Sequence, residues 1–431
     1  MSVLDVLFTV NLVMTSLISF FFLYQIALIF IGLFGKKKYP DAKEDHNYAI
    51  LIAGRNEEKV IGHLIESIKL QDYDLSKLKV FVVADNCTDN TAQVAREAGG
   101  EELFVHVFER HNLEKIGKGF ALDYMFKNIR ESFPDYIPDA FFVFDADNLL
   151  DKNYVKEMNK AFDNGAEVLT SYRNSKNFNT NWLSASTAMC FLRECRFMHS
   201  PRSILNTSTF VSGTGFLVSS KVLNFEDGWK YKTLTEDIEF SAGTIAKGKK
   251  VYYCDDAIFY DEQPTTFKAS WNQRMRWQKG FYQCFLGYFG SLFMSMFACN
   301  FFSKYEMMLM IFPFTPITFF WGVFYFMYQL AASIVTSVTI GFASSVLVFF
   351  IMNLLILAIS FMGVFFYGLL LLIRERKRVK TTYWEKIKFS AAFPIFLLTY
   401  IPIAIVCLFK KNVQWKKIPH EDSKKITEMN N

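Results

Sequence analysis

Both ends of the chain are apolar, and its middle is polar. Residues 6–34 carry no charged side chain, and further apolar stretches stand at about 306–332, 341–373 and 389–409. Each is long enough to cross a bilayer as a helix, which takes roughly 20 apolar residues. The aromatic, uncharged residues 281–302 fit either another crossing helix or a helix that lies in the headgroup plane.

Short apolar runs closed by polar or turn residues mark the middle of the chain. They stand at 48–54, 79–85 and 140–145. Runs that are apolar on both faces indicate buried parallel strands. Helical patterns accompany these runs, over 57–70 and over 90–98 behind an Asp89 cap. Alternating strands and helices predict a doubly wound α/β domain, whose ligands bind beyond the carboxyl ends of the strands.

Basic residues orient the apolar stretches. Three lysines at 36–38 directly follow the first stretch, so the positive-inside rule places the amino terminus outside and residue 39 onward in the cytoplasm. A signal peptide would be shorter, with its basic residues in front, so we expect a retained anchor. The basic run 374–380 follows an apolar stretch and therefore indicates a cytoplasmic membrane flank rather than a nucleic-acid site.

The last apolar stretch conflicts with this rule. If it crossed outward, it would carry four lysines outside, at 410, 411, 416 and 417. Pro394 and Pro402 interrupt it, which is also compatible with a broken, re-entrant or tightly paired segment. The number of crossings therefore stays open.

These patterns divide the 431 residues into five parts. We expect an anchor over 1–38, a cytoplasmic α/β domain over 39–280, an interfacial helix over 281–304, membrane helices over 305–411 and a polar tail over 412–431. The seven cysteines form no CxxC pair and no metal-like spacing, which fits structural thiols in a reducing compartment. The pattern as a whole predicts a multi-pass protein of the plasma membrane.

Two acidic motifs lie where catalytic carboxylates are expected. Asp145 and Asp147 stand two residues apart at a strand end, so both can point into one crevice. Such a pair can hold Mg²⁺ or Mn²⁺ together with substrate phosphates, although taken alone it is more often a turn. Asp237 stands where a helix could begin and could act as a general base, whereas an acidic first turn is its commoner interpretation.

An amphipathic stretch rich in arginine and tryptophan, 270–279, precedes the membrane region. At helical spacing Gln273, Arg276 and Trp277 share one face. An arginine can balance charge on a departing diphosphate, and an indole can stack on a sugar ring, but the stretch would equally suit a helix that docks on the membrane. The sequence contains no GxGxxG or P-loop motif, and Lys118 between two glycines is weak evidence of a phosphate contact.

Taken in order, these motifs resemble the processive family 2 glycosyltransferases of the GT-A fold, which include cellulose, hyaluronan, chitin and poly-N-acetylglucosamine synthases. The resemblance covers about residues 47–280 and implies a metal ligand, Asp147, with Mg²⁺ or Mn²⁺ as cofactor. It implies a general base, Asp237, with Gln273 and Arg276 as further catalytic residues. The implied contacts with a uridine diphosphate (UDP) sugar and with the acceptor are Ala53, Arg55, Asn56, Glu57, Asp85, Lys118, Asp145, Gly213, Thr214, Glu236 and Trp277.

The resemblance implies an inverting transfer, in which Asp237 deprotonates the acceptor hydroxyl while the metal and Arg276 stabilise the leaving diphosphate. The form Thr235-Glu236-Asp237 favours UDP-glucose and a processive β-1,4 or mixed β-1,3/1,4-glucan synthase that pushes its polymer across the membrane. The expected partners are the donor, the growing polysaccharide, the lipid bilayer and any extracytoplasmic export partner, with no nucleic acid.

Three alternatives stay open. The first is a synthase of the poly-N-acetylglucosamine or hyaluronan type. The second is a non-processive transferase that adds one sugar to a lipid acceptor and shares the fold, the metal motif and the base. The third, from another class, is a transporter or receptor whose domain only binds a nucleotide sugar. Such a binding protein would need no general base.

Overall fold

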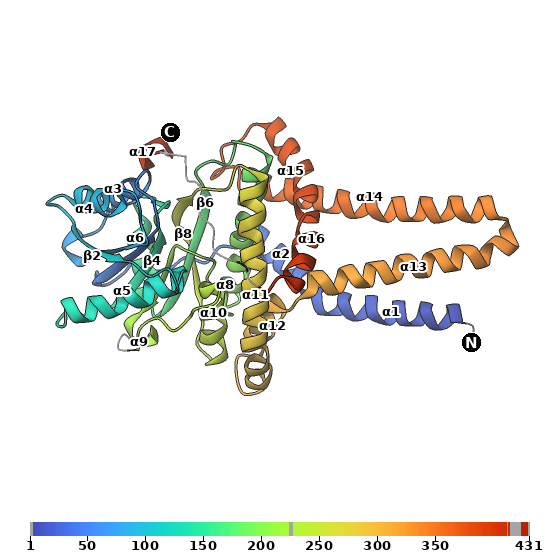
Figure 1. Cartoon of the computed structure of the whole chain (residues 1–431), viewed down its shortest axis with the longest axis horizontal. Helices are drawn as coiled ribbons and strands as arrows, with labels where there is room; N and C mark the ends of the chain where they lie inside the picture. The colour runs from blue at the N-terminus through green and yellow to red at the C-terminus, as the bar shows by residue number, and fades with distance from the viewer. Residues whose placement is uncertain (1–2, 224–226, 412, 414–423, 430–431) are drawn as a thin grey trace.

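The computed structural model describes residues 3–223, 227–411, 413 and 424–429. An α/β domain forms one end of the molecule, helices cover one side of that domain, and three long helices project from this covered side (Figure 1). Of the polar tail expected over 412–431, the structure describes residue 413 and residues 424–429. All seven cysteines are free thiols.

A mixed sheet of eight strands forms the centre of the domain, in the order β3-β2-β1-β4-β7-β6-β8-β5. The strands are β1 (Tyr48–Gly54), β2 (Leu78–Asp85), β3 (Phe104–Arg110), β4 (Ala140–Asp145), β5 (Leu149–Leu150), β6 (Val168–Ser175), β7 (Phe216–Ser219) and β8 (Tyr252–Asp261). The first four strands run parallel, whereas β7 is antiparallel to both β4 and β6. The predicted α/β domain is confirmed, and the antiparallel pairings of β7 and of β5 with β8 are additions to it.

Helices cover both faces of the sheet. On one face lie α3 (Ile61–Lys69), α4 (Thr91–Gly99) and α6 (Tyr154–Asp163), and on the other α5 (Lys118–Ser132) and α10 (Glu236–Ala246). Ala49 and Leu51 of β1 pack towards α5, while Ile50 and Ile52 pack towards α3, and all four are fully buried. This two-sided burial explains why the strand runs lack a polar face. The short helices η1 (Leu75–Lys77), α9 (Ser220–Leu223) and α17 (Ile426–Met429) complete the domain.

A layer of helices covers the side of the domain from which the three long helices project. It contains α7 (Trp182–Arg193), a π-helical turn η2 (Glu194–His199), α8 (Ser200–Ile204), α11 (Phe267–Met296), α12 (Phe301–Ile311), α15 (Tyr383–Leu398) and α16 (Tyr400–Phe409). Helix α11 joins the amphipathic stretch 270–279 to the aromatic residues that follow it, so the boundary expected at residue 281 falls inside one helix.

The apolar ends form α1 (Val3–Phe22), α2 (Tyr24–Phe34), α13 (Phe314–Ile340) and α14 (Phe342–Arg374). Among the described residues four helical stretches are long and apolar enough to cross a bilayer: 5–34, 314–339, 342–374 and 383–409. Figure 1 shows α1, α13 and α14 projecting side by side, whereas α15 and α16 lie across their bases.

The last apolar stretch is broken into two helices held against the domain. Its carbonyl groups at Ala404 and Cys407 accept hydrogen bonds from Tyr282 (3.0 Å) and Lys279 (3.4 Å) of α11. The Nζ of Lys410, just beyond α16, lies 3.7 Å from the sulfur of Met275 in the same helix. The broken arrangement, one of the open alternatives, is thus the one found, and it keeps the following lysine on the side of the domain.

The basic run 374–380 is folded into the domain. Arg378 forms an ion pair with Asp255 of β8 (2.7 Å). Glu375 is only 1% exposed and accepts hydrogen bonds from Arg196 of η2 (2.5 Å) and from the hydroxyl of Tyr172 in β6 (2.8 Å). These contacts fix the end of α14 to the sheet, so the run has a structural role that its charge pattern alone did not indicate.

Glu375→Gln is expected to destabilise the protein by about 3 kcal/mol, because it removes the nearer carboxylate partner of the buried Arg196 and leaves only Asp255, 3.9 Å away. The measurement is thermal unfolding of the purified chain in detergent. Asp72→Asn is a matched control, since it removes an exposed ion pair with Lys156 and should leave the unfolding temperature nearly unchanged. Equal unfolding temperatures for the two variants would contradict this role of Glu375.

Candidate active site

A cavity of about 610 Å³ opens at the carboxyl ends of β1, β2 and β4. It brings together thirteen of the fifteen residues that the sequence singles out. These are Ala53, Arg55, Glu57, Asp85, Lys118, Asp145, Asp147, Gly213, Glu236, Asp237, Gln273, Arg276 and Trp277. They come from segments up to 224 residues apart (277 minus 53), so the fold gathers them at the edge where ligands of parallel sheets bind.

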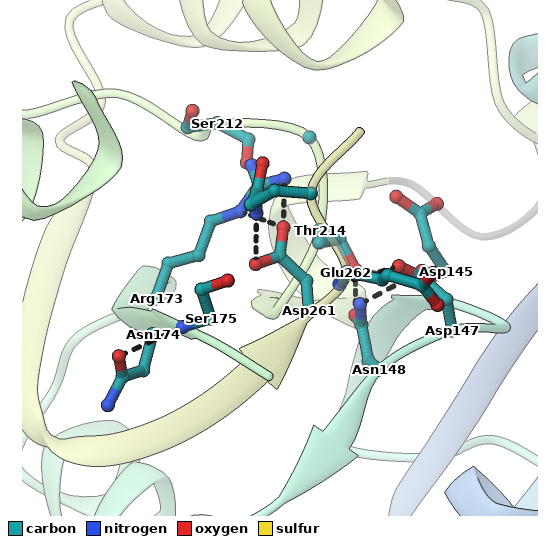
Figure 2. A network of polar contacts seen from close by, with 12 residues as sticks. Asp145, Asp147, Asn148, Arg173, Asn174, Ser175, Ser212, Thr214, Asp261 and Glu262 are labelled. Carbon is teal, nitrogen blue, oxygen red and sulfur yellow. Dashed lines mark hydrogen bonds and ion pairs between the residues drawn. The ribbon is translucent and has the colours of Figure 1, made fainter. Parts of the chain in front are cut away.

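The other two predicted residues lie outside the cavity lining. Asn56 adopts a positive φ of 59° and its side chain bonds to Thr88, with the Asn56 Oδ1 accepting from the Thr88 N–H (2.7 Å). Thr214 is 2% exposed, accepts from the backbone N–H of Asp145 (2.8 Å) and donates to Asn148 (2.5 Å; Figure 2). Both residues hold the backbone of the site in place.

The end of the cavity at β2, where a nucleotide is expected to bind, contains an ion pair that sequence reasoning missed. Asp85 is 6% exposed and pairs with Arg110 at the end of β3. Arg110 also donates to the carbonyl of Lys115 (2.6 Å). Because β2 and β3 are parallel neighbours with Asp85 and Arg110 in register, their pairing follows from the sheet. The arginine fixes the carboxylate that the sequence assigns to the nucleotide.

The cavity wall is acidic, with nine acidic and five basic side chains. Lys118 lies 2.5 Å from Asp145, and the Nε of Arg173 donates to Asp261 (2.6 Å). Burial raises the pKa of Asp261 to about 6, against the opposing effect of Arg173 and with a further rise from Asp147. A nucleoside diphosphate would add more negative charge to this wall, so its binding calls for a divalent cation.

The residues present fit such a cation. Asp147 accepts a hydrogen bond from the backbone N–H of Glu262 (3.1 Å), and Figure 2 shows Asp145, Asp147 and Glu262 on one side of the polar network. Carboxylate oxygens are the ligands that Mg²⁺ and Mn²⁺ prefer, and these ions share such sites with substrate phosphates. The end of β4 therefore offers a suitable donor set.

A second acidic group lies away from this cavity. The ligand atoms of Glu44, His46 and Asp163 lie within 4.8 Å of one another, close enough to hold a metal ion. They stand at the amino end of β1, whereas the cavity lies at its carboxyl end. Asp163 also accepts from the backbone N–H of Lys43 (2.8 Å), so these contacts attach the segment before β1 to α6.

Asp237 lies in the first turn of α10 and faces the loop before β7 that contains Gly213. Its Oδ2 accepts the backbone N–H of Gly213 (2.6 Å), which orients the carboxylate. Burial raises the pKa of Asp237 above its usual range. Burial and the charge of Asp237 raise the pKa of Glu236 to about 7, while Lys118 and Arg276 oppose this rise. The pair therefore holds a proton at pH values where free carboxyl groups have lost theirs.

This burial predicts an acid limb in the pH profile of kcat/KM. A carboxyl group with a raised pKa stays protonated to higher pH and cannot accept a proton in that state. As the pH is lowered, kcat/KM should therefore begin to fall at a pH above about 4, where free aspartate titrates. The measurement is UDP release from pH 4.5 to 8.5 at saturating metal. Glu236→Gln should keep this limb, because glutamine resembles the protonated Glu236. Loss of all activity in Glu236→Gln would instead make Glu236 the base.

Helix α11 presents two different faces. Gln273, Arg276 and Trp277 line the cavity, and Trp277 packs edge-to-face on Phe191 of α7 (5.7 Å between centroids). Arg274 points the other way, is fully buried, and donates to Thr399 at the break between α15 and α16 (2.5 Å). Its guanidinium also lies over the rings of two aromatic residues, Phe396 (4.3 Å) and Tyr400 (4.9 Å). One helix therefore carries site residues and the contact with the membrane-side layer.

The far end of the cavity reaches that layer. Its wall there consists of Phe281, Met310, Thr315, Leu397 and Tyr400, from α11, α12, α13, α15 and α16. None of these residues belongs to the motifs, and no sequence pattern distinguished them from other membrane-facing side chains. The cavity thus extends from the acidic strand ends to the bases of the long apolar helices.

Residues 46–280 match the family described as "Glycosyltransferase like family 2". The chain belongs to this glycosyltransferase family. The matched segment is the α/β domain with its mixed sheet, which is the GT-A glycosyltransferase fold. The sequence expectation of a family 2 glycosyltransferase of this fold is confirmed, whereas the processive type within it is not established by this match.

Known relatives are similar over the same domain. The chain is 26% identical over 246 residues to the probable glycosyltransferase YdaM of Bacillus subtilis, covering 55% of this chain and 56% of that protein. It is 27% identical over 244 residues to a beta-monoglucosyldiacylglycerol synthase of Synechocystis, covering 56% and 48%. The matched part is about half the length of these curated relatives.

Among solved structures, the mannosyltransferase PcManGT from Pyrobaculum calidifontis, in complex with GDP-Man and Mn²⁺, is similar with a TM-score of 0.48. The sequence identity is 16%, over 64% of this chain and 75% of that chain.

Proposed function

We propose that this glycosyltransferase moves one hexosyl group, with inversion, from a UDP-sugar to a hydroxyl group of a membrane lipid. The observation that carries the proposal is the extent of the cavity. It begins among Asp85, Asp145 and Asp147 at the strand ends and ends among Phe281 and Leu397 at the membrane-side helices. A soluble donor and a membrane-held acceptor could therefore reach one site from opposite ends.

Different residues of the cavity have different roles in the proposed reaction. Asp237, oriented by the Gly213 amide, takes the proton of the attacking hydroxyl. Arg276 lines the cavity and balances charge on the departing diphosphate. A divalent cation held by Asp147, when bound, would supply further electrostatic stabilisation of that diphosphate. The hydroxyl oxygen forms the new bond to the anomeric carbon as the bond to UDP breaks, so one displacement inverts configuration.

The helices favour a lipid over a growing polysaccharide as acceptor. In the described part of the chain, three helices project from the domain, and α15 and α16 lie across their bases (Figure 1). Helix α13 lies between α1 and α14 (Figure 1), and three helices side by side do not by themselves surround a channel for a sugar chain. The similarity to a beta-monoglucosyldiacylglycerol synthase supports the same choice, since that protein's name specifies a glycosylated lipid product.

A processive β-glucan synthase that uses UDP-glucose is the second candidate. It is favoured by Trp277, which lines the cavity beside Gln273 and Arg276, where an indole could support an acceptor sugar. In that case the polymer would leave through a path that involves further subunits or an export partner.

We also propose a membrane orientation. The lysines at 36–38 and the folded run 374–380 both stand on the domain side, which the positive-inside rule assigns to the cytoplasm. The amino terminus and the connection between α13 and α14 would then lie outside. The cell membrane is the expected location, with a domain over about 39–280 inside.

The test uses the full chain in lipid nanodiscs with diacylglycerol, Mg²⁺ or Mn²⁺, and individual UDP-sugars. UDP release and the products would be recorded together, by lipid extraction and by size. One sugar on an extracted lipid supports the proposal. High-molecular-weight product digestible by a β-glucanase would overturn it in favour of the second candidate. UDP release by the Asp237→Asn variant, measured in parallel, gives the background that does not depend on the site.

A further inference from the structure

A second cavity, of about 440 Å³, adjoins the first. Arg193, Glu194, Phe210, Phe281 and Met310 line both cavities and so form a neck between them. This inner cavity is enclosed by α2, η2, α8, α12 and α14, and it therefore lies between the domain and the bases of the projecting helices. None of the motif residues lines it, and the reaction described above does not use it.

The lining of the inner cavity is polar for a space at the base of apolar helices. Its hydrogen-bonding side chains are Tyr24, Gln25, Arg193, Glu194, Arg202, Ser208, Thr209, Ser303, Glu306 and Tyr367. The positive charges of Arg193 and Arg202 are balanced by the negative charges of Glu194 and Glu306. Arg202 and Glu306 already form a two-bond ion pair (3.0 and 2.5 Å). The other ten lining residues are apolar: Phe22, Ile29, Phe197, Met198, Phe210, Ile245, Phe281, Met307, Leu309 and Met310.

This chemistry discriminates among occupants. Arg202 and Glu306 are already paired with each other, but the buried Nε of Arg193 has no hydrogen-bond partner within the residues that the structure describes. An acyl chain would leave this donor unpaired, which costs free energy for a buried polar group. An anion would find no excess of positive charge, because each arginine is matched by a glutamate. A neutral group with several hydroxyls can donate to and accept from such a wall and can pack against its aromatic rings. The lining therefore suits a sugar.

The neck connects this cavity to the general base. The Ser212 hydroxyl donates to Glu194 (2.9 Å), and the next residue, Gly213, donates its backbone N–H to Asp237 (2.6 Å). The Nε of Arg193 is buried and has no hydrogen-bond partner among the described residues. Helix α7 widens into the π-helical turn at this point, and such local widening is frequent at functional sites. A ligand in the neck would have both a donor and an acceptor beside the base.

We propose that the inner cavity binds the sugar headgroup of an already glycosylated lipid, and that the neck aligns a hydroxyl of this sugar with Asp237. The inference rests on the proposed lipid acceptor and specifies its class. The step remains the displacement described above: the sugar hydroxyl gives its proton to Asp237, its oxygen bonds the anomeric carbon, and UDP leaves. The product would be a lipid that carries a disaccharide.

The test compares two acceptors with the same full-length protein. Dioctanoylglycerol and dioctanoylglycerol that carries one β-glucosyl group would be supplied with UDP-glucose, UDP-N-acetylglucosamine and UDP-galactose in turn. With the donor that reacts, we expect kcat/KM to be at least about tenfold higher for the glucosylated lipid. Equal or lower values for the glucosylated lipid would overturn the inference and leave the proposed function standing. Polymer with no lipid product would overturn both.

Two variants address the cavity itself. Gln25→Leu and Tyr367→Phe each remove hydrogen-bonding groups from the inner cavity wall with little change in volume. Each should raise the KM for the glucosylated lipid by about three- to tenfold, in keeping with the loss of a hydrogen bond, while kcat and UDP release to water stay unchanged. Gln329→Leu is the matched control, because Gln329 lies in α13 and bonds Asn353 outside both cavities. The same KM in all variants would overturn the inference.

Discussion

Asp237→Asn is expected to lower kcat by about 10²–10⁴-fold with little change in the KM for the UDP-sugar. Asparagine keeps the size of the side chain and can still meet the Gly213 amide through its carbonyl oxygen. It cannot take a proton from the attacking hydroxyl. The donor contacts, centred on Asp85 and Asp147, lie elsewhere in the cavity and are unaffected.

The measurement for this prediction is steady-state UDP release, with binding of UDP to the purified variant measured separately. Glu236→Gln is the control, because it alters the neighbouring carboxylate and leaves the proposed base intact. Because Glu236 is itself an expected substrate contact, this variant should change KM more than kcat. If Asp237→Asn retained more than about a tenth of the wild-type kcat, another group would be the base. If UDP binding were also lost, the substitution would have disturbed the fold.

The parallel half of the sheet was predictable from the sequence because its signal is local. The runs 48–54 and 140–145 coincide with β1 and β4, since buried strands need apolar residues on both faces. Strand β7 was missed because it has only four residues and follows an irregular loop. Its antiparallel place between β4 and β6 depends on pairing with distant strands, which no local pattern records.

The residues of the candidate site were likewise predictable only in part. Thirteen motif residues share the cavity because each sits at a strand end or on one face of a helix, positions that a sequence pattern can indicate. Arg110, Glu194 and Asp261 were missed because single charged residues in a sequence carry no sign of their partners. Arg173 meets Asp261 across 88 residues, and that contact exists only once β6 and β8 are neighbours.

Helix α11 gives a physical link between the membrane and the chemistry. Arg276 and Trp277 face the cavity, while Arg274 on the opposite face is fixed to Thr399 between α15 and α16. The alternation of these side chains follows from 3.6 residues per turn, and it explains why two arginines separated by one residue serve different purposes. A lipid acceptor that approaches past α15 and α16 would therefore meet a wall that is rigidly joined to Arg276.

Asp147→Asn is expected to abolish metal-stimulated transfer, with a loss of at least about 10²-fold in kcat/KM at any practical metal concentration. An amide oxygen is a weaker ligand than a carboxylate for Mg²⁺ or Mn²⁺, and the acidic wall around it repels an unaccompanied diphosphate. Metal-ion stabilisation of a leaving phosphate contributes several kcal/mol, and each 1.36 kcal/mol corresponds to a tenfold change in rate. The loss should fall on donor binding as well as on turnover, because the same ion would serve both.

The measurement is UDP release as a function of Mn²⁺ concentration, together with Mn²⁺ binding in the presence of UDP. Asp163→Asn is the matched control, because Asp163 belongs to the triad with Glu44 and His46 at the opposite end of β1. If the catalytic ion binds at the end of β4, Asp163→Asn keeps the wild-type metal dependence. The reverse result, normal stimulation in Asp147→Asn and its loss in Asp163→Asn, would move the functional metal to the triad. That triad lies at the opposite end of β1 from the cavity that Asp85 and Arg276 line, so the proposed mechanism assigns the metal to Asp147.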